Sequence, residues 1–312
     1  MGIKNLYKYL QKYSPSSVQR NNIKNLKNKI IGIDASFIIY KFVTAIRSTG
    51  KDLLNDKNEI TSHLYGIFFK IIYFLKFNII PIFVFDGTPP NIKFNNLEQR
   101  EELKNISEKK ILNNPTLMKK EFKKMFSIND NIISNTKKLL RYMNIQYIDA
   151  PGEADVMLAY LNDHKYTDGS YSDDTDILVF GGSKLYTKFD KYGNYFEIDL
   201  HHIMRELEIN RKQFIILCLL LGTDYCTKIK GLKMKNMIII IKTGNYNKFL
   251  KNECYLEAYN YYKNSINFID YKININKHIQ PKFKKLYEFM VEYNHFDKKR
   301  IISGFNKINY VA

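Results

Sequence analysis

Two short apolar runs that each end in an aspartate place the strongest constraint on the fold. The first is KIIGID at residues 29–34, and the second is IIPIFVFDG at residues 79–87. Uninterrupted Ile, Val and Phe runs of this length are typical of strands buried on both faces, as in parallel sheets. The segment between them has helical patterning, in ASFIIYKFVTAIRS and TSHLYGIFFKIIYFLKF. Strand, helices and strand in this order predict a βαβ unit of an α/β fold.

Two further strands are expected downstream, at NIQYIDA (144–150) and GSYS (169–172). The first precedes a helix, PGEADVMLAYLND, with Pro151 near its start, and the second opens into SDDTDILVFG. From about residue 200 onward the chain is mainly helical in pattern, in HHIMRELEI, KQFIILCLLLG, KMKNMIIIIKTG and PKFKKLYEFMVEYNHF. We interpret the Asn-, Lys- and Tyr-rich segment 242–280 as a compositionally biased, variable linker.

Acidic residues follow each of the four predicted strands. In open α/β sheets, ligands bind outside the carboxyl ends of the strands, so we expect these side chains to converge. Carboxylates in such numbers suit Mg²⁺ or Mn²⁺. Two such ions about 4 Å apart would relieve the repulsion and clamp a phosphodiester. The candidate ligands are Asp34, Asp86, Glu153, Asp155, Asp174, Asp176 and Asp224. For Glu153 alone, a charge at a helix N-terminus is an equally good interpretation, and for Asp173 a turn or cap role is the better one.

The net charge favours a polyanionic partner. The chain has 49 Lys and Arg against 31 Asp and Glu, a formal net charge of +18. Basic chains of this kind most often bind nucleic acid. Only seven of the basic residues are Arg, and Lys contacts phosphates as a point charge but is less suited to reading bases. We therefore expect backbone recognition, although AT-rich coding DNA would also enrich Lys, Asn, Ile and Tyr.

The sequence has no feature that indicates a membrane protein, a secreted protein or a zinc-binding protein. Lys70, Lys76 and Pro81 interrupt the apolar segment 67–85, so no stretch of about 18 apolar residues remains. The start, MGIKNLYKYL, has neither a signal-peptide pattern nor a myristoylation pattern. The three cysteines form no CxxC pair. We expect an intracellular protein without a membrane partner.

Six motifs resemble the flap endonuclease family in order and spacing: MGIKNL, IGIDAS, VFDGTPP, DAPGEAD, SDDTDILVFG and LLLGTDYC. FDKKRIISGFNKI (296–308) resembles the end of that family's core. The family comprises structure-specific 5′ nucleases, among them the xeroderma pigmentosum group G repair nuclease. The resemblance implies an α/β/α PIN-like nuclease core with a mostly parallel twisted sheet at 1–90 and 136–200. It also implies a helical arch at 91–135 and, at 201–312, a helical duplex-DNA-binding region with a helix–two-turn–helix hairpin.

The resemblance also implies roles for single residues. The seven carboxylates would bind two Mg²⁺ ions, for which Mn²⁺ could substitute, with Asp173 beside them as a non-ligand. Lys93 and Arg100, at the base of the arch, would act catalytically by drawing in the scissile phosphate and stabilising its developing charge. The alternative is that neither residue is catalytic and both lie on a solvated, charged face of a helix.

Three further positions match DNA-contacting positions of the family. Tyr40 would stack on a base beside the scissile phosphate, and core packing is an equally good interpretation of it. Arg47 would contact DNA directly. Gly2 would place the start of the chain close to the site.

The implied activity is Mg²⁺-dependent hydrolysis of branched double-stranded DNA at 5′ flaps, nicks and gaps, in replication, repair or recombination. A 5′–3′ exonuclease activity is compatible with it. Two alternatives stay open. One is a Holliday-junction resolvase or processive 5′ exonuclease that uses the same carboxylates. The other is a non-catalytic DNA-binding scaffold, against which the full carboxylate set argues because it would repel phosphate.

Two departures from the family pattern bear on partners. The hairpin IKGLKMKNM (229–237) keeps Gly231 but has Lys233 and Met234 in place of a Gly and a Pro, which leaves the K⁺ site of that hairpin open. The chain stops at NKINYVA, without a sliding-clamp peptide. We therefore expect a monomeric, clamp-independent enzyme in the nucleus or at a cytoplasmic site of DNA replication such as a viral factory.

Overall fold

The computed structural model describes residues 2–90, 105–107, 110, 121–229, 231–269 and 271–309. A mixed sheet of seven strands lies at its centre, in the order β1-β7-β6-β5-β2-β3-β4. Neighbours from β6 to β4 pair in parallel, whereas β7 pairs antiparallel with both β6 and β1. The strands are β1 (Val18–Asn22), β2 (Ile30–Asp34), β3 (Ile80–Phe85), β4 (Tyr147–Asp149), β5 (Gly169–Tyr171), β6 (Lys184–Thr187) and β7 (Asn194–Asp199).

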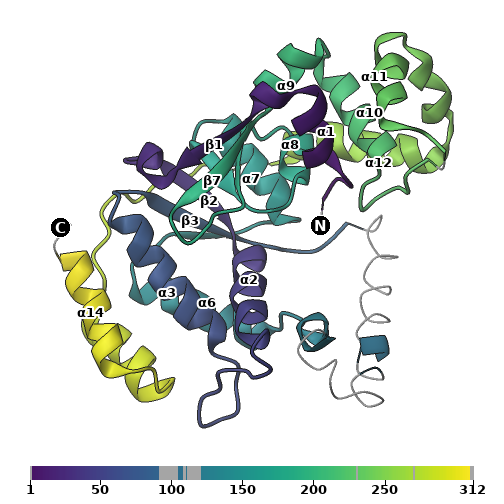
Figure 1. The fold of residues 1–312 in the computed structure, drawn as a ribbon. Helices are drawn as coiled ribbons and strands as arrows, with labels where there is room; N and C mark the ends of the chain where they lie inside the picture. Colours follow the sequence, from purple (N-terminus) through teal and green to yellow (C-terminus); the bar gives the residue numbers. More distant parts are fainter. Residues whose placement is uncertain are drawn as a thin grey trace.

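Helices cover both faces of the sheet (Figure 1). One face carries α2 (Ala35–Arg47), α3 (Ser62–Leu75), α6 (Asp130–Tyr142) and α14 (Lys298–Asn309). The other carries α1 (Leu6–Tyr13), α7 (Ala154–Asp163), α8 (Asp176–Phe180), α9 (Leu200–Leu207) and α10 (Arg211–Leu221). The remaining helices are α11 (Met234–Lys242), α12 (Glu253–Asn264), α13 (Phe283–Tyr287) and the π-helical turn η8 (Glu288–Tyr293). The short 3₁₀ turns are η1 (Pro15–Ser17), η2 (Ile23–Leu26), η5 (Phe122–Met125), η6 (Asn245–Lys251) and η7 (Ser265–Phe268). The predicted α/β/α core with a mostly parallel sheet is confirmed.

Strand β3 shows why the apolar runs become strands buried on both faces. Its side chains alternate between two apolar cores, with Ile82 and Val84 in the core on the α7 side and Phe83 and Phe85 in the core on the α2 side. Successive side chains of a strand point to opposite faces, so a continuous apolar run fills both cores. Each fully buried side chain of this size contributes about 1.5–3 kcal/mol relative to leaving it exposed.

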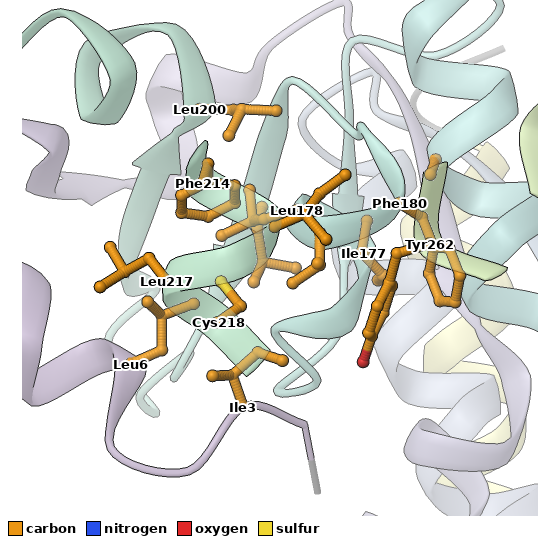
Figure 2. Packing of buried hydrophobic residues seen from close by; sticks show 14 of the residues in the cluster. Ile3, Leu6, Ile177, Leu178, Phe180, Leu200, Phe214, Leu217, Cys218 and Tyr262 are labelled. Carbon is orange, nitrogen blue, oxygen red and sulfur yellow. The ribbon is translucent and has the colours of Figure 1, made fainter. Parts of the chain in front are cut away.

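The core on the α7 side joins the start of the chain to its helical second half (Figure 2). Leu6 of α1, Leu178 of α8 and Leu217 of α10 are fully buried together. Tyr262 of α12 reaches the same core beside Phe180. The contact between α12 and α8 matters for the site, because α8 begins with an acidic residue.

The sequence-based assignment succeeds for the inner strands and misses three others. The predicted strands at 29–34, 79–87, 144–150 and 169–172 are confirmed as β2, β3, β4 and β5. β1, β6 and β7 were not predicted. The interpretation of 242–280 as a linker is wrong for residues 245–268, which form η6, α12 and η7. Tertiary packing of α12 against α8 and α10 overrides the biased composition of this segment.

The last described helix packs on the α2 side of the sheet. α14 packs against α3, and Phe305 joins the core on the α2 side. A Cβ at Gly304 would lie 2.8 Å from Cδ1 of Ile72, so the two helices approach closely. Within the described residues, no helix is long and apolar enough to cross a membrane.

The turn after β3 is tightly packed against the loop that leads into α7. The N–H of Gly87 donates to the carbonyl oxygen of Gly152 (2.7 Å). A Cβ at Gly87 would overlap the carbonyl oxygen of Ala150, which is backbone and cannot rotate away. At Gly152 an added Cβ would meet only the carbonyl oxygen of Thr88, at 3.8 Å. These two glycines therefore make a matched pair.

Gly87→Ala should lower the free energy of unfolding by about 1–3 kcal/mol, the usual cost of overpacking. Gly152→Ala should leave it close to the wild-type value, because its Cβ enters an ordinary contact. Urea denaturation of both variants measures the difference. Equal stability of the two variants would contradict the close approach of β3 to this loop.

Candidate active site

Asp34 occupies the junction between β2 and α2. It is the last residue of the strand and the N-cap of the helix, where Oδ1 accepts the N–H of Phe37 (2.9 Å). Its Oδ2 accepts the hydroxyl of Ser172 (3.0 Å). The side chain is buried, and loss of solvation, with the nearby charges of Asp86 and Asp174, raises the pKa of Asp34 to about 7.

Asp86 follows β3 and lies between the first turns of two helices. Its Oδ2 accepts the hydroxyl of Ser36 in α2 (2.6 Å), and its Oδ1 accepts the N–H of Ala154 in α7 (2.9 Å). Helix N-termini carry partial positive charge. The carboxylate of Asp86 is therefore fixed by neutral donors at a favourable position.

Glu153 and Asp155 both lie at the start of α7. Glu153 is the N-cap residue and Asp155 lies in the first turn. Asp155 Oδ1 is inaccessible to solvent and has no hydrogen-bond partner among the described residues. Burial raises the pKa of Asp155 well above its usual range, and four carboxylates raise it further: Asp174, Asp34, Asp176 and Asp86. Carboxylates from three other strand ends, those of β2, β3 and β5, therefore act on this one side chain.

Asp174 and Asp176 lie in the turn between β5 and α8, and both are buried. The N–H of Asp174 donates to Ser172 Oγ (3.0 Å), and Oδ1 of Asp174 accepts the N–H of Asp176 (2.9 Å). Asp176 opens α8, where its carboxylate lies at a helix N-terminus. The turn thus presents both carboxylates toward Asp155.

Asp173 belongs to a different environment. It is exposed, and its Oδ1 accepts the hydroxyl of Thr187 (2.6 Å) and the N–H of Lys188 (2.9 Å) at the end of β6. These bonds give Asp173 a turn-stabilising role. Within the SDDTD stretch, Asp173 therefore bonds to the end of β6 and the loop after it, whereas Asp174 and Asp176 belong to the site.

The start of the chain lies against the same turn. Gly2 has φ +79°, and a Cβ there would lie 2.5 Å from Asp174 Oδ1 and 2.7 Å from the backbone nitrogen of Thr175. The N–H of Ile3 donates to Thr175 Oγ1 (2.9 Å). Only glycine fits this position, both for its backbone angle and for the lack of space.

Asp224 lies in a compact turn after α10. Thr223 Oγ1 accepts the N–H groups of Tyr225 (3.0 Å) and Cys226 (3.1 Å), which fixes the turn. Asp224 is half-buried there. The hydroxyl of the next residue, Tyr225, donates to Glu153 Oε2, so this turn contacts the start of α7.

Two tyrosines of α12 also donate to site carboxylates, and the sequence analysis missed them. The hydroxyl of Tyr261 donates to Glu153 Oε2 (2.7 Å), and the hydroxyl of Tyr262 donates to Asp176 Oδ1 (3.2 Å). Their signal in the sequence is weak: the YNYY stretch lies in a segment whose composition is rich in Tyr throughout.

Two of the predicted DNA contacts can be placed. Tyr40 is 38% exposed and its ring lies 5.9 Å from that of Phe126, so it is not a core residue. Arg47 is buried, and its guanidinium donates twice to Asp52 (both 2.9 Å) and once to the carbonyl oxygen of Phe122 (3.2 Å). A DNA contact by Arg47 stays a prediction that requires these bonds to change.

Lys93 and Arg100 lie outside the described residues, as does most of the arch predicted at 91–135. Their catalytic roles stay predictions.

We name five of the acids the carboxylate cluster, because electrostatic coupling links them: Asp34, Asp86, Asp155, Asp174 and Asp176. Among the described residues, no group of three His, Cys, Asp or Glu side chains is already arranged to hold a metal ion. The donors nevertheless fit a hard divalent cation, since all are oxygens. The buried and partnerless Asp155 Oδ1 also needs a ligand to offset its loss of hydration.

Comparison with known proteins gives consistent matches. The sequence matches the XPG N-terminal domain over residues 1–107 and the XPG I-region over residues 144–224. It is 35% identical to flap endonuclease 1 of Methanococcus aeolicus, over 94% of this chain and 93% of that protein.

Solved structures share the fold. Flap endonuclease-1 from Methanococcus jannaschii matches with a TM-score of 0.74 and 24% identity, over 94% of this chain and 96% of that one. The catalytic core of Rad2 in complex with a DNA substrate matches with a TM-score of 0.69 and 23% identity, over 98% of this chain and 100% of that one.

The raised pKa values predict that pH changes the stability of the metal-free protein. Between the usual Asp pKa of 3.8 and the folded value of about 7, the folded state binds more protons at Asp34 than the unfolded chain does. The free energy of unfolding should therefore fall as pH rises through this window, by at most about 1.4 kcal/mol per pH unit for each such group. Urea denaturation in EDTA at pH 5 and pH 7 measures this.

Asp34→Asn serves as the control, because the amide oxygen can still accept the N–H of Phe37 but cannot titrate. The fall between pH 5 and pH 7 should be smaller in this variant. Added Mg²⁺ should stabilise the wild type more at pH 7 than at pH 5, since it binds the charged carboxylates. Equal stabilisation by Mg²⁺ at both values would contradict the assignment of the cluster to a cation.

Proposed function

The chain belongs to the XPG and flap endonuclease family, and from that premise we propose that it is a structure-specific 5′ nuclease that hydrolyses DNA phosphodiester bonds at the carboxylate cluster. Its proposed substrates are branched duplexes with a 5′ flap, nick or gap. One observation carries the proposal more than any other. The buried, partnerless oxygen of Asp155 faces four further carboxylates at the carboxyl edge of the parallel strands, where ligands bind in open α/β sheets.

The proposed cofactor is a pair of Mg²⁺ ions. When bound, divalent cations neutralise charge on a phosphodiester and activate the attacking water. The residues that would hold them are the carboxylate cluster together with Glu153 and Asp224. The protein's own part is to fix these carboxylates, and it does so with the hydroxyls of Ser36 and Ser172 and the N–H groups at the starts of α2 and α7.

Duplex DNA is proposed to bind along the hairpin between α10 and α11. Gly231 has φ +78°, and among the described residues nothing other than its chain neighbours lies within 4 Å of the position of a Cβ. Lys228, Lys233 and Lys235 are exposed around it. Lys233 is the N-cap of α11, with no side-chain hydrogen bond to the helix. Free N–H groups at a helix N-terminus next to lysines suit a DNA phosphate.

The single-stranded side of the substrate is proposed to pass over α2 and the arch. Tyr40 is exposed on α2, the helix that Asp34 caps, and is available for base stacking. Lys93 and Arg100 are proposed to contact the scissile phosphate. A single copy of the chain is sufficient for this arrangement, so we propose that the enzyme acts as a monomer.

Asp86→Asn should reduce cleavage of a 5′-flap substrate by on the order of 10³-fold or more, because cation-based charge stabilisation is worth several kcal/mol. DNA binding should survive. The matched control is Asp173→Asn, which changes an acid of the same site region that bonds instead to Thr187 and Lys188. Its amide oxygen can keep these bonds, so its cleavage rate should stay close to that of the wild type.

Cleavage rates should be measured in Mg²⁺ on a panel of flap, gapped and four-way junction substrates. Preference for the flap supports the proposal, whereas preference for the junction supports a resolvase. Wild-type cleavage by Asp86→Asn would show that the site is assigned wrongly. DNA binding without cleavage of any substrate by the wild type would support the scaffold alternative.

A further inference from the structure

We propose that Tyr261 and Tyr262 of α12 are positioning residues, which orient Glu153 and Asp176 for cation binding. The inference rests on the proposed nuclease function, because it concerns the same site. It assigns a role in catalysis to a helix that carries none of the candidate ligands. The role is exerted through the carboxylates, and neither tyrosine needs to touch DNA.

The geometry places one hydroxyl of α12 on each carboxylate. Tyr261 donates to Glu153 Oε2 at 2.7 Å, and Tyr262 donates to Asp176 Oδ1 at 3.2 Å. Tyr225 donates to the same Oε2 of Glu153. A carboxylate is planar and rigid, so donors that fix one oxygen also fix the direction of the other. Hydrogen bonds to charged groups are stronger than those between neutral groups, so each one favours a single rotamer of its carboxylate.

The rings of both tyrosines are themselves locked in place. Tyr262 is only 1% exposed, and its ring lies 4.8 Å from that of Phe180 (Figure 2). The ring of Tyr261 lies 5.6 Å from Phe180 in an edge-on arrangement. Tyr225 makes edge-on contacts with both, at 5.1 Å each. Because these ring contacts restrain both side chains, the hydroxyls act as oriented donors.

The two hydroxyls also connect two different parts of the site. Glu153 precedes α7 and Asp176 begins α8, while Tyr261 and Tyr262 are adjacent on α12. One helix therefore sets the orientation of two carboxylates that come from different strand ends. Removing both donors leaves Glu153 oriented by Tyr225 alone and takes this hydroxyl from Asp176, so the carboxylates should rotate apart more easily, because like charges in a buried site repel. Cation binding would then have to overcome that rearrangement.

The test compares tyrosine-to-phenylalanine changes that remove only the hydroxyl. The double variant Tyr261→Phe/Tyr262→Phe removes the α12 donor from each carboxylate and leaves the hydroxyl of Tyr225 on Glu153. The control is Tyr255→Phe on the same helix, whose hydroxyl donates to the carbonyl oxygen of Thr227 (2.6 Å). If the hydroxyls of α12 served only to fix this helix to the rest of the protein, Tyr255→Phe would have the same effect as the double variant.

Mn²⁺ binding to the DNA-free protein, measured by isothermal titration calorimetry, is the first readout. The double variant should bind Mn²⁺ about 10–100-fold more weakly, the usual effect of losing a partner that orients a metal ligand. The control should bind as the wild type does. The second readout is the Mg²⁺ concentration at half-maximal cleavage, which should rise in the double variant, and the loss of rate should shrink as Mg²⁺ is increased.

Wild-type Mn²⁺ affinity and an unchanged Mg²⁺ requirement in a folded double variant would overturn the proposal. Equal weakening by Tyr255→Phe would overturn it too, since the effect would then be structural. If circular dichroism shows that the double variant is unfolded, the single variants Tyr261→Phe and Tyr262→Phe are judged by the same criteria. Failure of the wild type to bind Mn²⁺ would instead count against the proposed function.

Discussion

The crowding of carboxylates at one edge of a parallel sheet is the constraint on which the rest of the structure depends. Parallel strands end on the same edge of a sheet. When each buried strand is followed by an acidic residue, the carboxylates therefore lie close together. Burial and mutual repulsion raise the pKa values of Asp34 and Asp155 and make the charged state unfavourable. The two apolar cores on either face of the sheet offset this cost and hold the strand ends together.

The inner sheet and the positions of its acids could be predicted because their signals are local. An apolar run and the acid at its end occupy consecutive positions, as in β3 and Asp86, and need no knowledge of the partner strand. The outer strands lack such a signal. β1 reads VQRNN, with no apolar run, and β7 reads NYFEID. These segments become strands through their antiparallel pairing, in which Val18 faces Ile198 and Arg20 faces Phe196. Pairing of this kind is a tertiary property.

Side-chain partners explain the remaining gaps between sequence and structure. The composition of 242–280 led to its interpretation as a linker, yet it contains α12, which places Tyr261 and Tyr262 at the site. In the sequence, Tyr261 lies 108 residues from Glu153, and Tyr262 lies 86 residues from Asp176. Arg47 shows the converse. Its position in the sequence suits a DNA contact, but its guanidinium is bonded to Asp52, only five residues away. A sequence identifies which residues can donate or accept a hydrogen bond, whereas the fold decides which partner each one reaches.

The donors described above for Asp34, Asp86, Glu153 and Asp176 share one chemical property, which is that they are neutral. The hydroxyls of Ser36, Ser172, Tyr261 and Tyr262 and the N–H groups at helix starts orient the acids without cancelling their charge. A lysine or arginine in the same place would bind more strongly but would compete with a cation for the carboxylate oxygens. In the described part of this chain, Asp34, Asp86 and Asp155 form no ion pair with a basic side chain, although the sequence contains 49 Lys and Arg. Separation of the two kinds of charge is what the proposed function requires, with a polyanion bound over the basic surface and cations bound at the carboxylate cluster.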